Sequence, residues 1–520
     1  MILSRFAFVL KSKSIFLNMV RQKIIFFFFF IVFSQTIFSQ FYTLPNSWVF
    51  QQIQDFNLLS ADTSLPTNVY PFNPLVYSSF SDKDTNYRLF KYIKNDPALD
   101  ILFEKDVVHI QQKDFSIRIN PLINFLKGKQ TGDTSISTFT NTRGFIASAK
   151  WSNIYIETLL SENQSVFSDY LYNYSKSTQI VPGQGRWKNF KASGFDYAFS
   201  GGLVSFQAHR NVNVSIGTGK QKIGNGYRSL FLSDNSFVYP FVKIEQNWWK
   251  GRFYYVCTYA FLNNLVSASI NIPPYTERLF QKKPFVYQYL NIGLTKKMRM
   301  GLFQSIIGES PDTKNVWRGD GILFSPVIFS QLMYYNWQNK NNVLAGMDLQ
   351  YKVFKTLLLY SQLIIDDIDG FKNDDGYGYQ IGLKYLGKWN DWRLSILTEW
   401  NDVKKTTYSA PLFDNYSNSS YSHFNQNLAF TINNGKEWVT QIFLKKQRWV
   451  FNGQWNIQMK KAYWTTMNDV NYYKLLFGFV VNPSYNLILN LGLENRFSNI
   501  NTQCIYIQLH TSLYNIYYDF

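Results

Sequence analysis

Apolar and polar residues alternate along most of the chain from about residue 115 onward, the spacing expected of β-strands. In "YNLILNLGLEN" (485–495) every second residue from 487 to 493 is leucine, whereas Asn486, Asn490 and Glu494 lie on the opposite side of the pattern. "WRLSILTEW" (392–400) repeats the scheme with large apolar residues opposing arginine, serine and glutamate. On a strand, such a period of two gives one apolar and one polar face. A soluble β-sandwich and a membrane β-barrel both produce this alternation, so the lengths of the connections must distinguish them.

Short turn segments recur between these strands and alternate with much longer connections. The short ones are "KWSN" (150–153), "HRNVN" (209–213), "WKGR" (249–252), "TKKMR" (295–299), "KVFKT" (352–356), "KWNDW" (388–392), "KKQRW" (445–449) and "NPSYN" (482–486). The long connections are 163–200, 220–240, 264–284, 309–341 and 403–435. Short turns at one end and long loops at the other are typical of outer-membrane barrels. The predicted fold is therefore all-β, a transmembrane outer-membrane β-barrel of about 18 antiparallel strands over residues 115–520 with long extracellular loops.

The stretch "SLYNIYYDF" (512–520) places Tyr514, Ile516, Tyr518 and Phe520 at alternate positions. This spacing predicts a last strand that pairs with the first, because an open sheet edge in a membrane would leave backbone groups without hydrogen bonds. It also predicts an assembly signal, since the last strand is where an outer-membrane insertion machinery would bind. Deletion of residues 512–520 is therefore expected to abolish assembly.

The region before residue 115 has a different character. Residues 1–39 combine Arg21 and Lys23, an unbroken apolar run at 24–33 and Ser39 at a cleavage position, which predicts a signal peptide whose start is Met1 or Met19. The apolar run is too short to cross a bilayer core of roughly 30 Å as a helix. Residues 40–114 show helix-like spacing in "SWVFQQIQDFNLL", "YRLFKYI" and "DPALDILFEK". We expect a periplasmic or plug-like segment with short helices there.

Composition agrees with a membrane barrel. Aromatic residues make up 19% of the chain, yet its mean hydropathy is only −0.20. A wall that alternates apolar and polar residues and carries aromatic girdles gives both values together. The net charge of +18 predicts acidic surroundings, such as anionic lipid, lipopolysaccharide and polysaccharide. The sequence has no basic helix or RNA-binding motif, so we do not expect a nucleic-acid partner.

Catalytic and metal-binding motifs are weak. The four histidines have no HExxH spacing, and no GxSxG, phosphate-binding or dinucleotide-binding motif occurs in a suitable context. We therefore expect no enzyme, although a hydrolase with a Ser–His pair on adjacent strands is an alternative. The acidic stretch "IIDDIDGFKNDDG" (364–376) offers Asp366, Asp367 and Asp369 as oxygen ligands for Ca²⁺. A polar turn explains the same residues, and no other cofactor is predicted.

Two loop blocks carry the residue types that bind sugars, namely "GQGRWKNFKASGFDYAFSGGLVSF" (183–206) and "KQKIGNGYRSLFLSDNSFVYPF" (220–241). Aromatic rings stack on sugar faces, and Asp, Asn and Arg side chains hydrogen-bond to hydroxyls. Turns rich in Gly, Asn and Asp explain the same composition without a ligand. The candidate glycan-binding residues are Arg186, Trp187, Asn225, Tyr227, Arg228, Asp234 and Asn235.

In these blocks the sequence resembles the Wzi-like capsule-assembly barrels, and within them the RemB-type gliding-motility proteins. The residues that carry the resemblance are "IGNGYRSLFLSDN" with "YPF" after it, and more loosely "PGQGRWKNF", "GMDLQYK" and "YSHFNQNLAF". The resemblance covers most of residues 180–430, whereas "VYPFNPLVYSSF" departs from the family pattern. It implies a non-enzymatic barrel in the outer membrane of a Gram-negative bacterium that binds and organises surface polysaccharide or serves gliding. Other outer-membrane motility or secretion proteins are implied as partners.

Two alternatives remain open at the level of sequence. One is a porin-like or oligosaccharide-uptake channel, and the other is an accessory barrel of a secretion or adhesin complex. A channel leaves an aqueous path through its lumen, whereas a binding scaffold has a lumen filled by loops, by inward side chains or by the 40–114 segment.

Overall fold

The structure is a computed structural model, and it describes residues 47, 51–52, 55–56, 68–71, 96–267, 280–308, 321–336, 341–366, 376–405, 407–408, 419–432, 434–460 and 469–520. The predicted signal peptide lies outside the described residues. So do the "YRLFKYI" segment and most of the predicted Ca²⁺ stretch, including Asp367 and Asp369.

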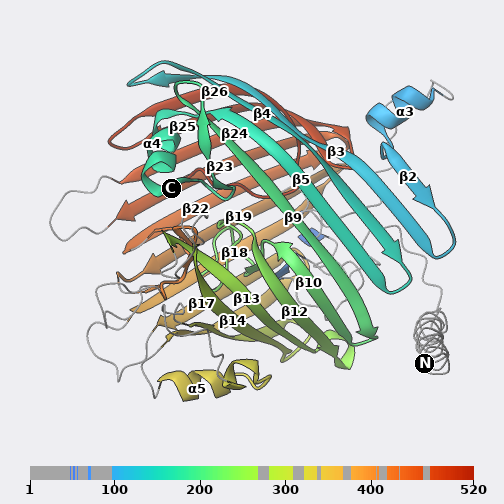
Figure 1. The fold of residues 1–520 in the computed structure, drawn as a ribbon, viewed down its shortest axis with the longest axis vertical. Helices are drawn as coiled ribbons and strands as arrows, with labels where there is room; N and C mark the ends of the chain where they lie inside the picture. Colours follow the sequence, from blue (N-terminus) through green and yellow to red (C-terminus); the bar gives the residue numbers. More distant parts are fainter. Residues whose placement is uncertain are drawn as a thin grey trace, which may run out of the picture.

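A closed antiparallel barrel of 18 long strands forms the molecule (Figure 1). In chain order the strands are β3 (Phe115–Gly132), β4 (Ile136–Trp151), β5 (Ile154–Val166), β9 (Gly194–His209), β10 (Val212–Gly219), β12 (Tyr239–Trp248), β13 (Phe253–Ser267), β14 (Phe280–Gly293), β15 (Met298–Ile307), β16 (Asn342–Phe354), β17 (Leu357–Asp366), β18 (Gly376–Trp389), β19 (Trp392–Val403), β22 (Gly435–Lys446), β23 (Trp449–Lys460), β24 (Val470–Asn482), β25 (Leu487–Phe497) and β26 (Thr502–Thr511). Each pairs with the next, and β26 pairs with β3. The predicted all-β fold and strand number are confirmed.

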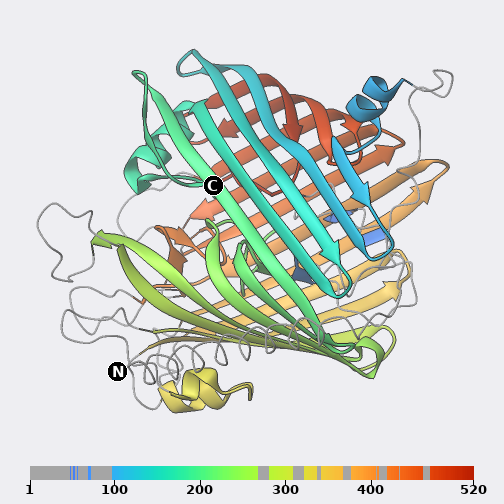
Figure 2. The ribbon, with the colours of Figure 1, turned by 45° about the vertical axis from the view of Figure 1, so that its right-hand side comes forward.

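The connections differ between the two ends of the barrel. Every short turn predicted from the sequence falls between two consecutive strands at one end, which we call the short-turn end. At the opposite end, the long-loop end, β5, β10, β15 and β19 end and the next long strands of the barrel begin, and many more residues separate each of these pairs. The helices α3 (Pro97–Phe103) and α4 (Asp169–Thr178) lie at opposite ends of the barrel (Figures 1 and 2).

Smaller elements decorate this frame. They are the helix α5 (Ser330–Asn336), the 3₁₀ helices η2 (Trp249–Gly251) and η3 (Gly321–Phe324), and the short strands β1 (Val69–Tyr70), β2 (Val108–Gln111), β6 (Ile180–Val181), β7 (Gly185–Arg186), β8 (Lys188–Phe190), β11 (Lys222–Ile223), β20 (Ser422–His423) and β21 (Gln426–Asn427). The helix α3 begins where "DPALD" predicts it. The Asp96 carboxylate accepts hydrogen bonds from the main-chain N–H groups of Ala98 and Leu99, at 2.9 and 3.4 Å, and so caps the first turn.

The barrel wall is polar inside and apolar outside. In β19, Arg393, Ser395 and Glu399 are buried and face the lumen, as the alternation predicts. On β25, Leu489 and Leu491 are 40% and 58% exposed on the outer face. A soluble protein buries such leucines and exposes such charges, so this inverted distribution suits a wall surrounded by lipid.

Exposed aromatic side chains gather near both edges of the outer wall, as in the girdles of membrane barrels. They include Trp151, Trp249, Trp389 and Trp449 near the short-turn end and Tyr377, Trp438, Tyr473 and Phe497 near the long-loop end. Among the helices in the described part of the chain, none has the length and hydrophobicity needed to span a bilayer.

The lumen contains the described residues of the N-terminal segment that precede α3. Residues 51–52 and 55–56 are helical, and the Asp55 carboxylate lies 2.6 Å from the Lys384 ammonium on the inner face of β18, with both side chains buried. Phe56 packs against leucines of β17 and β18 near the short-turn end. Further along, β1 pairs with β11 of the connection between β10 and β12. These contacts hold the described residues before α3 against the inner wall and the connection between β10 and β12, and a plug role stays a prediction.

The predicted terminal strand at 512–520 is wrong. The last strand, β26, ends at Thr511, and the closing ladder with β3 is complete without the residues that follow. Residues 512–520, here called the tail, turn into the lumen and run to the long-loop end, where Phe520 lies beside α4 (Figure 1). Because an extended chain has the same period of two whether or not it pairs in a sheet, the alternation of its residues did not distinguish the two cases.

The alternation in the tail has another use than the predicted one. Asn515, Tyr517 and Asp519 are buried against a lumenal loop, whereas Tyr518 and Phe520 contact aromatic rings in and near α4, and Ile516 is 37% exposed. Tyr514 packs on Phe199 of β9. Whether these residues also act as an assembly signal stays a prediction.

Truncation after Thr511 separates closure of the barrel from a signal role. Refolding in detergent requires no insertion machinery, and the β26–β3 ladder remains, so the truncated protein should still give a heat-modifiable folded band. We expect its unfolding temperature to be lower, because lumenal polar groups lose their partners. Truncation after Asn501, which also removes β26, is the control and should give no folded band. Loss of the folded band after the first truncation would show that the tail is needed for barrel closure.

Candidate functional site

The lumenal loop between β10 and β12 contains most of the predicted glycan-binding residues. Asn225, Tyr227, Arg228, Asp234 and Asn235 all lie in it, and all are buried inside the barrel. The prediction of a long extracellular loop is therefore wrong for residues 220–238, which lie inside the barrel. The physical reason is that its charged and aromatic groups find complementary groups on the inner wall and on the tail.

Arg228 is the centre of a buried network of charges. Its Nε and Nη2 atoms each donate to the Glu437 carboxylate of β22 at 2.8 Å, and Nη2 lies 3.1 Å from the Asp519 carboxylate. All three side chains are at most 2% exposed. A guanidinium group fits this role because its planar fork of donors matches a carboxylate in a bidentate pair.

A second buried carboxylate holds the backbone of the same loop. The main-chain N–H groups of Tyr227 and Arg228 each donate to one oxygen of Glu399 at 2.9 Å. Gly226 makes this possible, because a side chain there would collide with the Glu399 carboxylate. The sequence "GNGYR" is therefore a carboxylate-binding turn on the inner wall.

The loop is joined to the tail by further hydrogen bonds. The Tyr227 hydroxyl donates to the Asp519 carboxylate at 2.6 Å. Burial raises the pKa of Tyr227 well above its usual value, and the negative charge of Asp519 raises it further. The Asp234 carboxylate accepts hydrogen bonds from the Tyr517 hydroxyl at 2.6 Å and from the Asn515 amide at 3.1 Å. The loop and the tail thus form one polar unit inside the barrel.

An apolar core lies next to this unit. Leu230, Phe231 and Leu232 are fully buried among rings of β12–β15 and of the connection between β19 and β22. The Phe231 ring stacks on Phe303 with ring centres 4.8 Å apart. The motif "RSLFLSDN" therefore holds the loop to the wall in two ways, through the charge of Arg228 and through the apolar side chains of residues 230–232.

Arg186 and Trp187 do not join the lumenal residues. Arg186 is exposed near the long-loop end, with its guanidinium 4.6 Å from the centre of the Phe280 ring. The Trp187 indole donates to the Ser175 carbonyl at 2.9 Å, and its ring lies between Lys176 and Phe195. The Trp187 ring is thus engaged in packing beneath α4, and glycan contact by the seven candidates stays a prediction.

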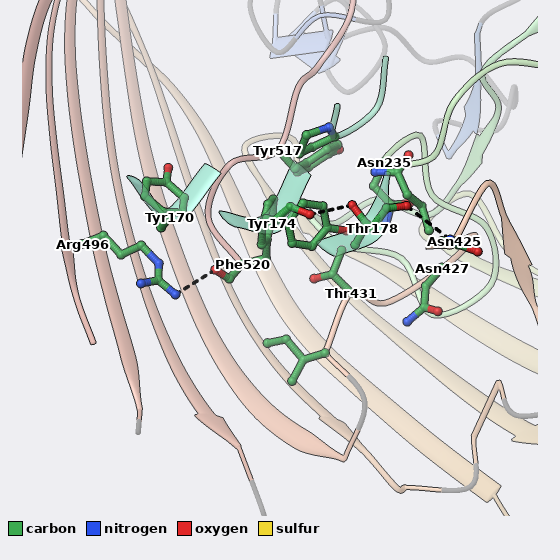
Figure 3. A pocket seen from close by; sticks show the side chains of 13 residues that line it. Tyr170, Tyr174, Thr178, Asn235, Asn425, Asn427, Thr431, Arg496, Tyr517 and Phe520 are labelled. Atoms are coloured by element: carbon green, nitrogen blue, oxygen red, sulfur yellow. Dashed lines mark hydrogen bonds between the residues drawn. The ribbon is translucent and has the colours of Figure 1, made fainter. Parts of the chain in front are cut away.

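A pocket of about 400 Å³ opens at the long-loop end, and we call it the mouth pocket (Figure 3). It is lined by Tyr170, Tyr174, Thr178, Pro182, Asn235, Asn425, Gln426, Asn427, Thr431, Ile432, Arg496, Tyr517 and Phe520. The lining combines aromatic rings with side-chain amides, hydroxyls and one arginine. Such a set can stack on the apolar face of a ring and hydrogen-bond to its hydroxyls.

The helix α4 and the tail position the aromatic side of the mouth pocket. Tyr170 and Tyr174 are four residues apart and so share one face of α4. The centre of the Phe520 ring lies 4.2 Å from that of Tyr174 and 6.4 Å from that of Tyr170. Arg496 of β25 lies over the Tyr170 ring and donates to the Phe520 carbonyl at 3.3 Å, as Figure 3 shows.

A tight hairpin positions the amide side. The strands β20 and β21 pair through a two-residue turn, Phe424 and Asn425, in which both residues have positive φ. The Asn425 amide donates to the Thr178 carbonyl at 3.2 Å, and the Gln426 side chain accepts from the Gly183 N–H at 3.2 Å. These bonds connect the hairpin to α4 and to the segment that follows it.

Sequence reasoning missed most of the mouth pocket. Of its lining residues, Asn235 was a predicted sugar-binding residue and Phe520 a predicted assembly residue. The paired tyrosines in "DYLYNYS" and the amide run in "YSHFNQNLAF" are the signals that could have identified the others. Neither segment indicates the pocket alone, because its walls come from five separate parts of the chain.

The predicted Ca²⁺ site is only partly within the described residues. Asp366 accepts a hydrogen bond from the main-chain N–H of Tyr408, which uses one of its oxygens. Within the described ranges, no cluster of three or more His, Cys, Asp and Glu side chains is arranged to hold a metal ion. Calcium binding by Asp366, Asp367 and Asp369 stays a prediction.

The comparisons with known proteins address the fold. No protein-family profile and no curated protein matches this chain. Among solved structures, the barrel is similar to Wzi from Escherichia coli, with a TM-score of 0.55 and 13% identity over 90% of this chain and 99% of the Wzi chain. Wzi is described as an outer-membrane, carbohydrate-binding β-barrel involved in group 1 capsule assembly. The Pseudomonas aeruginosa proteins OccK9 (OpdG) and OccK3 (OpdO) align over 76% of this chain, each with a TM-score of 0.43, at 10% and 9% identity, and over 97% and 94% of their own lengths. The fold expected from the resemblance to Wzi-like barrels is confirmed, whereas membership of the RemB type is not tested.

Replacing Arg228 tests whether the charge network holds the lumenal loop. Arg228→Leu leaves Glu437 and Asp519 buried without a cation, so we expect the free energy of unfolding to fall by about 3–5 kcal/mol. Arg186→Leu removes the same charge from an exposed site and should change it by less than about 0.5 kcal/mol. Urea unfolding of the refolded protein in detergent measures both. Equal effects of the two substitutions would contradict the network's role.

Acid should loosen the hairpin side of the mouth pocket through His423. Its Nδ1 accepts from the Asn263 N–H at 3.0 Å and its Nε2 donates to the Val238 carbonyl at 3.2 Å, which requires a neutral ring. Burial and then the nearby Lys283 ammonium lower the pKa of His423 from 6.5 to about 3. Because the detached hairpin binds a proton below pH 6.5 and the docked one does not until about pH 3, docking weakens as pH falls through this window.

We therefore expect the hydrogen-exchange protection of residues 419–432, corrected for intrinsic exchange, to fall by up to about tenfold per pH unit below 6.5. His423→Gln can make both hydrogen bonds without titrating, so the variant should show little dependence on pH. Equal pH dependence in the two proteins would rule out His423 as the cause.

Proposed function

We propose that this protein is an outer-membrane barrel of a Gram-negative bacterium that binds surface polysaccharide at its mouth pocket without catalysing a reaction. The observation that carries the proposal is the lining of this pocket, which combines the rings of Tyr170, Tyr174 and Phe520 with the amides of Asn425 and Asn427. The long-loop end would face the cell exterior, as in other outer-membrane barrels. A glycan chain would then reach the pocket without crossing the barrel.

The filled lumen supports a binding role over conduction. The described residues 51–52, 55–56 and 68–71, the loop 220–238 and the tail all lie inside the wall, and buried ion pairs attach the first group and the loop to it. A porin-like or oligosaccharide-uptake channel would need these segments to move. The similarity of the fold to Wzi, a carbohydrate-binding barrel, agrees with the proposed ligand class.

A second cavity, inside the lumen, is the feature that favours the channel alternative. It has a volume of about 290 Å³ and lies between the tail and the inner faces of β3–β5 and β23–β26, with many polar side chains in its lining. Planar-bilayer recordings of the full-length protein and of the form truncated after Thr511 separate the two roles. The binding proposal expects no steady conductance from the full-length protein.

We also propose that the bound polysaccharide serves gliding motility, in company with other outer-membrane motility, secretion or adhesin proteins. The support is the resemblance of "IGNGYRSLFLSDN" and its neighbours to RemB-type proteins. In this proposal most of the motif does not contact the polysaccharide. Its buried residues hold the loop and the tail, and both contribute side chains to the mouth pocket.

Substitutions in the mouth pocket test glycan binding. Tyr174→Ala combined with Asn425→Ala removes a ring contact of about 1 kcal/mol and a hydrogen bond of about the same size. Affinity for polysaccharide extracted from the producing cells should therefore fall about tenfold or more, since about 1.4 kcal/mol is a factor of ten. Calorimetric titration of the detergent-solubilised protein measures this.

Tyr351→Ala is the matched control, because Tyr351 is exposed on the outer wall of β16, away from the mouth pocket. Cells carrying each variant at equal protein level should be compared for retention of surface glycan and for spreading on a solid surface. Unchanged affinity in the pocket variant would refute the proposed site. Unchanged spreading with lost affinity would refute only the role in gliding.

A further inference from the structure

The outer wall of the barrel carries a polar stripe that lipid alone would not tolerate. Gln288 of β14 and Gln304 of β15 are paired neighbours whose side chains point outward, because Tyr287 and Phe303 beside them face the lumen. The two amides are hydrogen-bonded to each other at 2.7 Å, and both are fully buried. Unpaired amides facing hydrocarbon would be strongly unfavourable, so their burial needs a cover.

The cover is a segment of the connection between β15 and β16, residues 321–334, which includes η3 and most of α5. Figures 1 and 2 both draw α5 outside the barrel wall. Leu323 of this segment packs on Val286, Ile306 and Val343, whose side chains share the outer face with the two glutamines. We call residues 321–334 the outer flap.

The polar groups of the outer flap point toward the wall. Gln288 donates to the Ser325 carbonyl at 2.6 Å, and the Phe329 N–H donates to Gln304 at 2.8 Å. The Tyr255 hydroxyl of β13 donates to the Pro326 carbonyl at 2.6 Å. The backbone of the flap thus has hydrogen-bond partners where it leaves regular helix, which is the condition for irregular backbone to lie at membrane depth.

Leu323 packs on the wall, but other apolar side chains of the outer flap are exposed. Phe324, Val327 and Met333 are 57%, 62% and 72% exposed, and Tyr334 is 41% exposed. They continue the apolar band of the barrel, since the neighbouring outward residues Tyr351 and Met347 of β16 are also exposed. A flap that turns its amides to the wall and its rings outward has the polarity of a membrane-embedded element.

We propose that the outer flap lies in the lipid phase and that its exposed side chains contact the acyl chains of the outer membrane. The flap then converts the polar stripe into lipid-facing surface and anchors the connection between β15 and β16 beside the barrel. This inference rests on the proposed membrane location of the barrel. It assigns a lipid-binding surface to a connection that the strand pattern alone would place in water.

Quenching by brominated lipid tests the contact. Single cysteines at Met333→Cys, Ile381→Cys and Asp391→Cys, in a Cys257→Ala, Cys504→Ala background, are labelled with an environment-sensitive fluorophore. The protein is then reconstituted in vesicles of brominated or ordinary phosphatidylcholine. Ile381 is 61% exposed on the outer wall of β18, and the Asp391 side chain is 77% exposed at a short turn. We expect quenching at 333 comparable with that at 381, and none at 391.

The outcomes separate this inference from the proposed function. Quenching at 381 without quenching at 333 would overturn the flap's lipid contact while leaving the membrane barrel in place, and it would point to water or to a covering protein there. Absence of quenching at both 333 and 381 would overturn the membrane location, and the flap inference with it.

The native Cys257 tests the contact between the outer flap and the wall on which the proposal depends. It is buried on the outer face of β13, forms no disulfide, and its sulfur lies 3.7 Å from the Gln288 amide under the flap. Gln288→Leu with Gln304→Leu removes the hydrogen bonds to the flap, so alkylation of Cys257 by N-ethylmaleimide in a Cys504→Ser background should accelerate about tenfold or more. An unchanged rate in a folded variant would show that the glutamines do not hold the flap.

Discussion

The buried ion pair between Arg228 and Glu437, with Asp519 as the third member, is the interaction on which the interior of this barrel depends. A charge inside a protein needs a partner of opposite sign, because removing it from water costs several kcal/mol. Here the cation comes from a loop, one anion from the wall and the other from the tail, and the two anions lie 209 and 291 positions from the cation in the chain. The attraction between these charges holds the loop and the tail together against the wall, and these two segments fill the lumen.

The position of several mouth-pocket residues is set by this charge network. Tyr517 and Phe520 line it, and they flank Asp519, whose carboxylate is bound by Arg228, Tyr227 and Gln454. Asn235 lines it as well and adjoins Asp234, which binds the tail through Tyr517. A ligand at the mouth therefore contacts a surface whose position is set deep in the barrel, and a disturbance of the charge network should reach the pocket without direct contact.

The sequence predicted the wall much better than the interior. Alternation in strands such as β19 and β25, together with turn segments such as "KWNDW" and "NPSYN", was enough to place the strands and the two ends, because both signals are local. The lumenal loop and the tail could not be placed in this way. "SLYNIYYDF" has the spacing of a strand in either environment, and the partners that decide its course, such as Arg228 and Asp234, lie far away in the chain.

The sequence marked Arg228 and Tyr227 as groups suited to a ligand, and glycan contact by them stays a prediction. In the structure the loop has the carboxylates of Glu437, Glu399 and Asp519 as partners, which the sequence alone did not indicate. The outer flap could not be predicted either, because its hydrogen-bond partners lie on other strands. Its carbonyl and N–H groups bind the outward glutamines of β14 and β15, and in the strand pattern alone these glutamines look like polar residues on an apolar face.

A double-mutant cycle between Arg228 and Asp519 tests the central claim most directly. Free energies of unfolding would be measured in urea for the wild type, Arg228→Leu, Asp519→Leu and the double variant. If the charge network joins loop and tail, the two substitutions should be strongly non-additive, with a coupling free energy of about 1.5–3 kcal/mol. Additive effects within about 0.5 kcal/mol would mean that the two side chains do not interact in the folded barrel, and the account of the filled lumen would be contradicted.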